Sequence, residues 1–243
     1  MRSGNPVLKP NTFLDEVSDA SAPAMTLAGT VWKTIFLLLV LLATAAYAWS
    51  QREAGTVPAL VAVGGIGGFV FALVTIFKKT WSPMTAPVYA ALEGLVIGGL
   101  SSIFEHAYHG IVLQAALLTL CTLFGLLSLY ATGVIRATEN FKLGVFAATG
   151  GIALCYLASM VLHLLNIPIP FLHEGGTWSI VISLFVVVVA ALNLVVDFDF
   201  IESGVEHGAP KYMEWYGGFG LLVTLVWLYL EILRLLAKTQ SRR

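Results

Sequence analysis

The chain has 243 residues, of which 58% are hydrophobic and only 11% are charged, with a formal net charge of −1. A soluble domain carries about a quarter of charged residues, so this composition excludes an ordinary water-soluble protein and indicates a polytopic membrane protein. The near-neutral charge and the absence of a basic run exclude nucleic acid as an expected partner, while the lipid bilayer is an obvious one.

Seven segments are apolar over about 20 residues, the length that crosses the hydrocarbon core of a bilayer. The short polar separators between them contain turn residues, and no soluble module interrupts the series. The sequence therefore predicts an all-α, seven-transmembrane-helix bundle. We expect residues 1–29 to form a polar cytosolic tail, 30–238 the transmembrane domain and 239–243 a basic C-terminal tail. The predicted spans are Val31–Trp49, Pro58–Phe77, Met84–Phe104, Gly110–Tyr130, Gly144–Leu165, Trp178–Phe200 and Tyr216–Leu236.

The distribution of Lys and Arg in the short loops predicts the orientation of the bundle. Basic residues concentrate in the N-terminal segment and in the second, fourth and sixth loops, whereas Arg52 is the only one in the other three. We therefore expect the N-terminus and the even loops to lie in the cytosol. The basic C-terminus leaves two alternatives, a seventh crossing that places it outside or a re-entrant last segment. We expect seven crossings.

Glycines at close-packing spacing occur in several predicted spans. Gly94 and Gly98 form a small-xxx-small pair, and four glycines crowd the segment Gly64–Gly68. The latter run lies inside an apolar span without the preceding strand or following Lys of a nucleotide-binding loop. Such residues let helix backbones approach closely in lipid, so we expect them to serve helix packing.

The densest acidic cluster beside an apolar segment contains Asp197, Asp199 and Glu202, where the sixth span ends. Carboxylates at this depth are costly and commonly functional, although a solvated helix end is the simpler alternative. Asp197 and Asp199 point about 200° apart on a helix, so they cannot face one cavity. We expect Asp197 to be a pore-side partner of Glu93, with Asp199 and Glu202 nearer the cytosolic rim.

Two further carboxylates lie inside predicted spans. Glu93 is near the middle of the third span, where it could face an aqueous cavity or make a structural hydrogen bond. Glu231 lies in the last span, and its alternative is a local ion pair with Arg234, one turn further on the same helix face.

Other side chains give weaker signals. Cys121 and Cys155 lie in apolar runs and are expected to be unpaired thiols. His106, His109 and His173 fall in outer loops, where solvated histidines are more common than metal ligands. No motif of a hydrolase or a zinc protease is present, so we expect neither an enzyme nor a bound cofactor.

Three stretches carry a family resemblance: VVDFDFIESGVEHGAPKYMEWYG with the following LLVTLVWLYLEILRLL, APVYAALEGLVIGGLSSIFE, and YATGVIRATENFKLGVFAATGG. They resemble the Bax-inhibitor (TMBIM, or YccA-like) membrane proteins over nearly the whole chain beyond the N-terminal tail, and MRSGNPVL resembles the bacterial branch. The resemblance implies a seven-helix bundle with a central last helix, and a location in the bacterial inner membrane.

The same resemblance implies a pH-sensitive calcium leak, with Ca²⁺ and protons as the transported species. In the family the leak is attributed to two aspartates on the sixth and seventh helices that share a proton. By motif the first matches Asp197 and the second matches Glu231, where the family usually has Asp. Loss of the proton would create repulsion and offer hard oxygen ligands for transient Ca²⁺ binding at Asp197 and Glu231.

A second function remains open. The resemblance also implies a non-conducting regulator that binds a membrane-bound ATP-dependent protease or another membrane partner. The tail Met1–Ala24 and the stretch Ser203–Trp215 would then be its docking surfaces. A proton-coupled transporter is less favoured, because the sequence has no internal repeat.

Overall fold

The computed structural model describes residues 23–52, 55–165 and 177–241, without the side chains of residues 163, 164 and 177. In this part of the chain, seven helices are long and apolar enough to cross a membrane. The predicted all-α, seven-helix class is thereby confirmed. The helices are α1 (Leu27–Ser50), α2 (Val57–Phe77), α3 (Ser82–Ala107), α4 (Ile111–Ala131), α5 (Glu139–Leu164), α7 (Thr177–Glu206) and α8 (Met213–Gln240), with a 3₁₀ turn, η2 (Lys79–Trp81), before α3.

Local sequence explains several helix ends. Thr26 caps α1, since its hydroxyl accepts a 3.0 Å hydrogen bond from the backbone N–H of Gly29. Prolines in the first turn of α2 and α3 need no backbone donor there. Gly110 has a φ of 82° directly before α4, a conformation that favours glycine. Signals of this kind are what allow a sequence to indicate where helices begin.

The helices at the end of the chain are longer than predicted. α7 continues to Glu206, six residues past Phe200, and α8 begins at Met213, three residues before Tyr216. At 1.5 Å per residue they measure about 45 Å and 42 Å, against a hydrocarbon thickness of about 30 Å. Hydrophobicity reports only the lipid-soluble length, so the polar extensions were missed.

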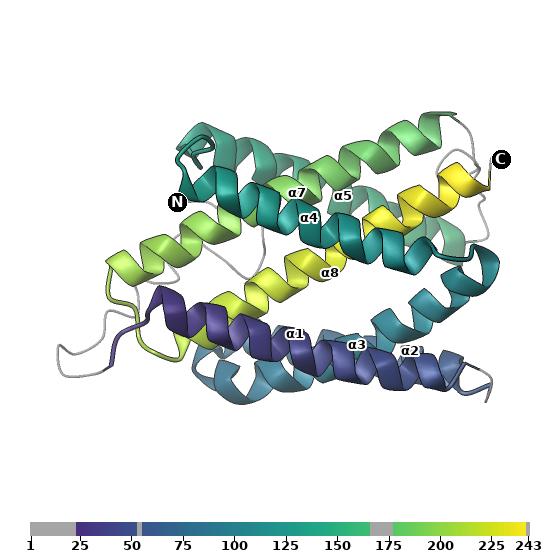
Figure 1. Cartoon of the computed structure of the whole chain (residues 1–243), viewed down its shortest axis with the longest axis horizontal. Helices are drawn as coiled ribbons and strands as arrows, with labels where there is room; N and C mark the ends of the chain where they lie inside the picture. Colours follow the sequence, from purple (N-terminus) through teal and green to yellow (C-terminus); the bar gives the residue numbers. More distant parts are fainter. Residues whose placement is uncertain (1–22, 53–54, 166–176, 242–243) are drawn as a thin grey trace.

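Helix α8 is the centre of the bundle, as the family resemblance predicted. It packs against α1, α3, α4 and α7, and Figure 1 shows it crossing diagonally between the α1–α3 layer and the group α4, α5 and α7. Its buried residues include Tyr216, Phe219, Leu222 and Leu228. Helix α5 lies at the periphery and packs mainly on α7. The centre of the bundle is therefore the surface of α8.

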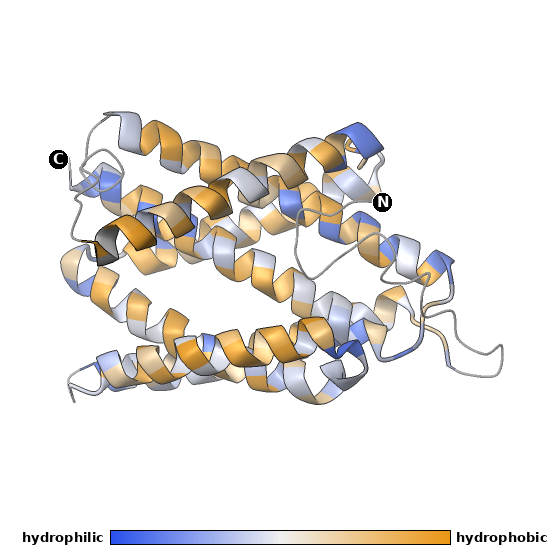
Figure 2. Ribbon diagram, turned by 180° about the vertical axis from the view of Figure 1, so that it is seen from behind, coloured by the Kyte–Doolittle hydropathy of each residue, from blue (hydrophilic) through white to orange (hydrophobic). Residues whose placement is uncertain are grey.

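The outer faces of the peripheral helices are apolar. Trp32, Ile66, Phe77 and Met84 are each at least 70% exposed. Figure 2 shows hydrophobic residues along the middle of the helices and hydrophilic ones concentrated toward their ends. This distribution fits a protein surrounded by lipid rather than by water.

Most glycines of α2 and α3 provide close helix contacts, which confirms the packing interpretation for them, whereas Gly65 has nothing within 4 Å of its Cβ position. A Cβ at Gly98 would collide with the backbone carbonyl of Ala45 on α1. A Cβ at Gly64 would lie 2.6 Å from the carbonyl oxygen of Leu92 on α3. These glycines let α1 and α2 approach α3 at backbone distance.

The segment before α1 is joined to the connection between α7 and α8. The Met25 N–H donates to the carbonyl of Ala209 at 2.7 Å, and the Lys211 N–H donates to the carbonyl of Pro23 at 3.1 Å. We call this the N-terminal end of the bundle; it also holds the connections 78–81 and 132–138. The opposite end, where α8 finishes, is the C-terminal end (Figure 1).

Candidate functional site

Asp197 lies fully buried in the interface between α7 and α8. Its side chain is 0% exposed, and its Oδ2 accepts a 2.5 Å hydrogen bond from the hydroxyl of Thr224 on α8. Asp197 is nine residues from the end of α7, which corresponds to about 14 Å along the helix. A buried carboxyl group is costly, and its position makes it the first candidate for function.

The two helices run antiparallel with a constant register. Fourteen residues from Asp197 toward the start of α7, the hydroxyl of Ser183 accepts a 2.8 Å hydrogen bond from Lys238. Lys238 lies fourteen residues past Thr224 on α8, so the two contacts are in step along the interface. This register decides which side chains of α7 and α8 can meet.

Glu231 lies further along α8, where its side chain meets α5. Its Oε1 accepts hydrogen bonds from Tyr156 of α5 at 2.8 Å and from Arg234 at 2.6 Å. The local pair with Arg234, which the sequence offered as an alternative, is therefore present. Glu231 is 2% exposed, and its Oε2 has no hydrogen-bond partner among the described residues.

The structure does not bring Asp197 and Glu231 together. Glu231 lies seven residues beyond Thr224, the residue opposite Asp197, which is about 10 Å along α8. In this arrangement the two carboxyl groups do not share a hydrogen bond. The motif match predicted Glu231 of α8 as the partner of Asp197, whereas the α8 side chain that the structure places against Asp197 is Thr224, two turns earlier.

Glu93 lies elsewhere. Its Oε2 is the nearest atom, at 3.2 Å, to a Cβ built on Gly68, so the carboxyl group packs against α2. Among the described residues, Glu93 forms neither a hydrogen bond nor an ion pair. The pairing of Glu93 with Asp197 was inferred from depth alone, and depth does not say which neighbour a helix face meets.

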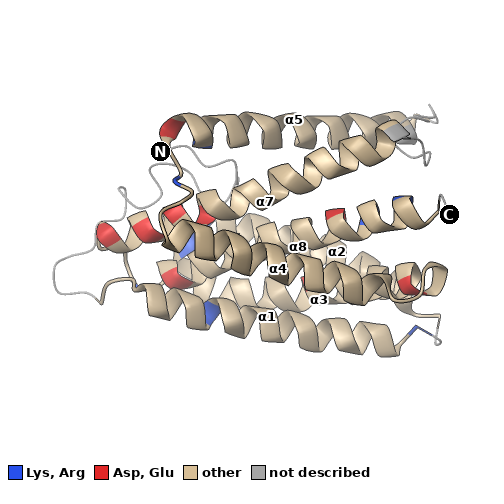
Figure 3. Ribbon diagram, turned by 45° about the horizontal axis from the view of Figure 1, so that its top comes forward, with Lys and Arg blue, Asp and Glu red and all other residues tan. Residues whose placement is uncertain are grey.

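Asp199 and Glu202 lie near the N-terminal end, close to the expected rim. Lys142 of α5, only 4% exposed, reaches Asp199 at 2.6 Å and Glu139 at 3.2 Å. The hydroxyl of Tyr130 donates to Glu202. Figure 3 shows acidic segments gathered at this end of the bundle. These acids tie α4 and α5 to α7.

One acidic residue of this end was missed. Glu214, in the first turn of α8, is 0% exposed and forms an ion pair with Lys33 of α1. It also accepts hydrogen bonds from the N–H and hydroxyl of Thr26, at 3.0 and 2.9 Å. The available signal was an acid beside aromatic residues in a stretch treated as a loop. This group, which we call the N-terminal clasp, consists of Thr26, Lys33 and Glu214.

Asn193 was also missed, although an amide within an apolar run is a signal. It is 2% exposed, and its Nδ2 donates to Thr149 of α5 and to the carbonyl of Val189, both at 2.8 Å. Its Oδ1 has no hydrogen-bond partner among the described residues. Asn193 therefore adds a polar group to the α7 face one turn from Asp197.

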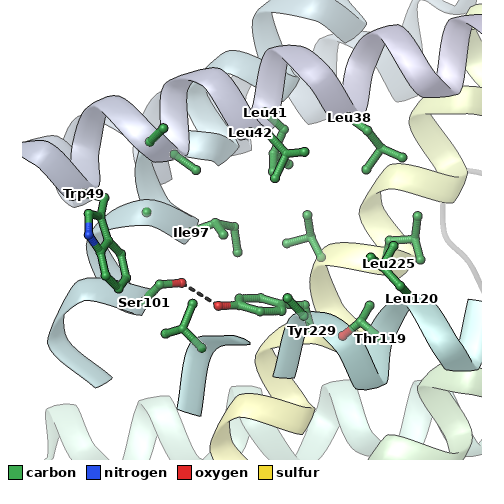
Figure 4. Close-up of a pocket in the computed structure, with 16 residues that line it drawn as sticks. Leu38, Leu41, Leu42, Trp49, Ile97, Ser101, Thr119, Leu120, Leu225 and Tyr229 are labelled. Carbon is green, nitrogen blue, oxygen red and sulfur yellow. Dashed lines mark hydrogen bonds between the residues drawn. The ribbon is translucent and has the colours of Figure 1, made fainter. Parts of the chain in front are cut away.

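An apolar cavity of about 410 Å³ opens between α1, α3, α4 and α8 (Figure 4). Leu42, Leu120 and Leu225 are among its lining residues. A 2.6 Å hydrogen bond between the hydroxyls of Ser101 and Tyr229 provides its main polar feature. The cavity suits an apolar guest, since none of its lining residues is charged.

The outer-loop histidines do not form a metal site in the described part of the chain. His106 and His109 line a second cavity with Glu105, but Glu105 accepts hydrogen bonds from the N–H groups of Gly110 and Val112, at 2.6 and 3.2 Å. It thus caps α4. No three His, Cys, Asp or Glu side chains among the described residues are grouped to hold a metal ion. His173 lies outside the described residues.

Comparison with protein-family models gives a match to the family described as Bax inhibitor 1 like, over residues 5–241. The match covers nearly the entire chain and includes all seven helices. Comparison with curated proteins gives no match, and neither does comparison with solved structures.

Proposed function

Because the chain belongs to the Bax inhibitor 1-like family, we propose that it is a pH-sensitive leak for Ca²⁺ in which Asp197 is the gating carboxyl group. The observation that supports this function is the position of Asp197, fully buried in mid-interface and hydrogen-bonded to Thr224. A protonated Asp197 is compatible with a closed, dry interface between α7 and α8. Deprotonation places a charge there and favours a state in which water reaches the carboxylate.

The gate in this proposal differs from a pair of acids. Thr224 supplies a neutral hydroxyl that donates to Asp197, so the proposal assigns the titrating proton to the Asp197 carboxyl group. An ionised Asp197 in a hydrated interface also offers hard oxygen ligands, which Ca²⁺ prefers. Ca²⁺ is here the transported ion, and its binding is transient.

The proposal is tested by measuring Ca²⁺ entry into proteoliposomes between about pH 5 and 8. Wild type should leak in a pH-dependent way, and Asp197→Asn should abolish the pH dependence because the amide cannot titrate. Asp199→Asn is the matched control, because it removes a carboxylate of the same helix that pairs with Lys142. It should keep the pH dependence. A leak that is independent of pH and unchanged in Asp197→Asn would rule out the mechanism.

The orientation and location belong to the same proposal. We place the N-terminal end in the cytosol and the protein in a bacterial inner membrane. The support is the set of basic residues at or near that end, which follows the rule for cytosolic loops: Lys33, Lys78, Lys79, Arg136, Lys142 and Lys211.

A second candidate function is a non-conducting regulator that binds a membrane partner such as an ATP-dependent protease. The cavity between α1 and α4 favours it, because an apolar side chain of a partner helix would fit there. The tail, which lies mostly outside the described residues, would add to the docking surface. The stretch around Ala209 is already engaged by Met25, so it is less available than the sequence suggested.

Photo-crosslinking distinguishes this second function. A crosslinker at Leu42, which lines the cavity and is 59% exposed, should capture a co-expressed membrane-bound protease. A crosslinker at Leu39, 60% exposed but outside the cavity lining, should not. Equal capture at both positions, or at neither, would count against a specific docking site. Absence of any leak from folded protein, with capture at Leu42 alone, would favour the regulator.

A further inference from the structure

The region between α5, α7 and α8 contains buried polar atoms besides those of Asp197 and Thr224. Asn193 Oδ1 and Glu231 Oε2 are both buried and have no hydrogen-bond partner among the described residues. Their side chains are each 2% exposed. Buried acceptors are nearly always satisfied by protein, water or ligand, so a pair of them in one interface calls for an explanation.

The polar side chains lie on the facing sides of the three helices. Residues four or seven apart return to the same helix face. Every helix of the group has one such pair, and each pair is joined to another helix by a hydrogen bond. The pairs are Asp197 with Asn193 on α7, Thr224 with Glu231 on α8, and Thr149 with Tyr156 on α5.

The register orders these groups along the axis of α8. Asp197 lies opposite Thr224, and the same register places Asn193 opposite Leu228, between Thr224 and Glu231. The three levels are therefore about 6 Å and about 4.5 Å apart along α8. Glu231 lies nine residues from the end of α8, as Asp197 lies nine residues from the opposite end of α7. The side-chain oxygen atoms of Asp197, Asn193 and Glu231 therefore follow one another through the middle third of the bundle.

We propose that α5, α7 and α8 enclose a hydrated path for the permeant cation, in which Asn193 Oδ1 is the intermediate ligand between Asp197 and Glu231. The path rests on the proposed leak function and extends it, because it assigns the route on the C-terminal side of the gate. Carboxylate and amide oxygens are suitable ligands for Ca²⁺. A neutral amide between two acids binds weakly enough for the ion to move on.

Two neighbouring groups restrict this path in the observed arrangement. Arg234 donates to Glu231 Oε1 at 2.6 Å, and its positive charge opposes a cation at that level. Ile152 of α5 forms a small apolar cluster with Val186 and Val189 of α7. An apolar constriction closes a path by excluding water, so we assign the observed arrangement to the closed state. Arg234, 44% exposed on its side chain, is the group that must leave Glu231 when an ion passes.

Cysteine accessibility tests the path independently of any flux. Cys121 and Cys155 are both exposed, so both are first changed to alanine. In that background, Asn193→Cys in proteoliposomes should react with the membrane-impermeant cation trimethylammonium ethyl methanethiosulfonate about tenfold faster than Leu194→Cys. Leu194 is the matched control, since it is adjacent, 0% exposed and part of the apolar core. Equal rates at the two positions, or no reaction at Asn193→Cys, would overturn the path.

Measurements of Ca²⁺ flux add a second test, in which some variants should lower the flux and another should raise it. Asn193→Leu and Glu231→Gln should each reduce Ca²⁺ entry several-fold, because the first removes an oxygen ligand and the second removes a negative charge. Arg234→Gln should increase Ca²⁺ entry, because it removes a positive charge. A decrease in Arg234→Gln protein that elutes as a folded species would contradict the assignment. If Asn193→Cys is accessible but no variant conducts Ca²⁺, the hydrated path stands and the leak function fails. If Ca²⁺ leaks but Asn193→Cys is unreactive, the leak stands and this route fails.

Discussion

Thr224 donates a hydrogen bond of 2.5 Å to Asp197 across the interface between the central helix and α7. The contact places a neutral hydroxyl opposite the most deeply buried acid of the proposed gate. It also defines the register of two helices that span the whole bundle, because Lys238 and Ser183 meet in step with it. The chemistry at Asp197 and the alignment of the polar groups around it therefore depend on the same interface.

Removal of the Thr224 hydroxyl should destabilise the protein. Thr224→Val keeps the shape but takes a donor from a buried carboxyl group, so the free energy of unfolding should fall by about 1–3 kcal/mol. Thr224→Ser keeps the hydroxyl and serves as the control for the hydrogen bond. Thermal denaturation in detergent measures both. If the valine variant were as stable as wild type while the serine variant were not, the methyl contact and not the hydrogen bond would matter.

The two lysines near Glu214 should differ in importance. Lys33 is paired with the fully buried Glu214, so Lys33→Met should cost on the order of 2 kcal/mol in the free energy of unfolding. Lys211 lies 4.0 Å from the same carboxylate and is 56% exposed, so Lys211→Met should cost less than about 1 kcal/mol. Chemical denaturation measures the free energy of unfolding of both lysine variants and of Glu214→Gln, which removes the shared carboxylate. Equal losses at the two lysines would contradict the assignment of the N-terminal clasp.

Glycine at position 98 should be required for the packing of α1 on α3. In Gly98→Ala the added methyl would meet the backbone carbonyl of Ala45, which cannot rotate away. The expected loss is about 1–3 kcal/mol in the free energy of unfolding. Gly125→Ala on α4 is the matched control, because nothing lies within 4 Å of its Cβ. It should be neutral or slightly stabilising, and a similar loss in both variants would show that contact with α1 is not the cause.

The two ends of the chain should lie on opposite sides of the membrane. α8 is a continuous helix from Met213 to Gln240, long enough to cross, which favours the seventh crossing over a re-entrant segment. Epitope tags at the N- and C-termini can be probed with antibodies on intact and permeabilised spheroplasts. We expect the C-terminal tag to be reached in intact spheroplasts and the N-terminal tag only after permeabilisation. Tags on the same side would mean that one of the seven helices does not cross.

The sequence by itself determined the features that depend on neighbouring residues along one helix. The seven apolar spans were found because hydrophobicity acts over about 20 consecutive residues. The pair Glu231–Arg234 followed from one turn of helix, and the packing role of Gly98 from the spacing of small residues. The helix ends were less well predicted, since Glu206 and Met213 extend their helices into polar sequence.

The tertiary structure decided which helix faces meet, and therefore what the candidate site is. Asp197 was selected as a candidate from the sequence, but its contact with Thr224 depends on the register of α7 against α8. Asn193 meets Thr149 from a helix 44 positions earlier in the sequence, and Glu214 meets Lys33 from 181 positions away. Helical periodicity says which residues of one helix share a face, but it carries no information on the level at which a second helix is placed beside it. Glu231 lies two turns, about 10 Å, beyond Thr224 on α8, and this distance along the helix decides that Asp197 meets a hydroxyl group instead of a second acid.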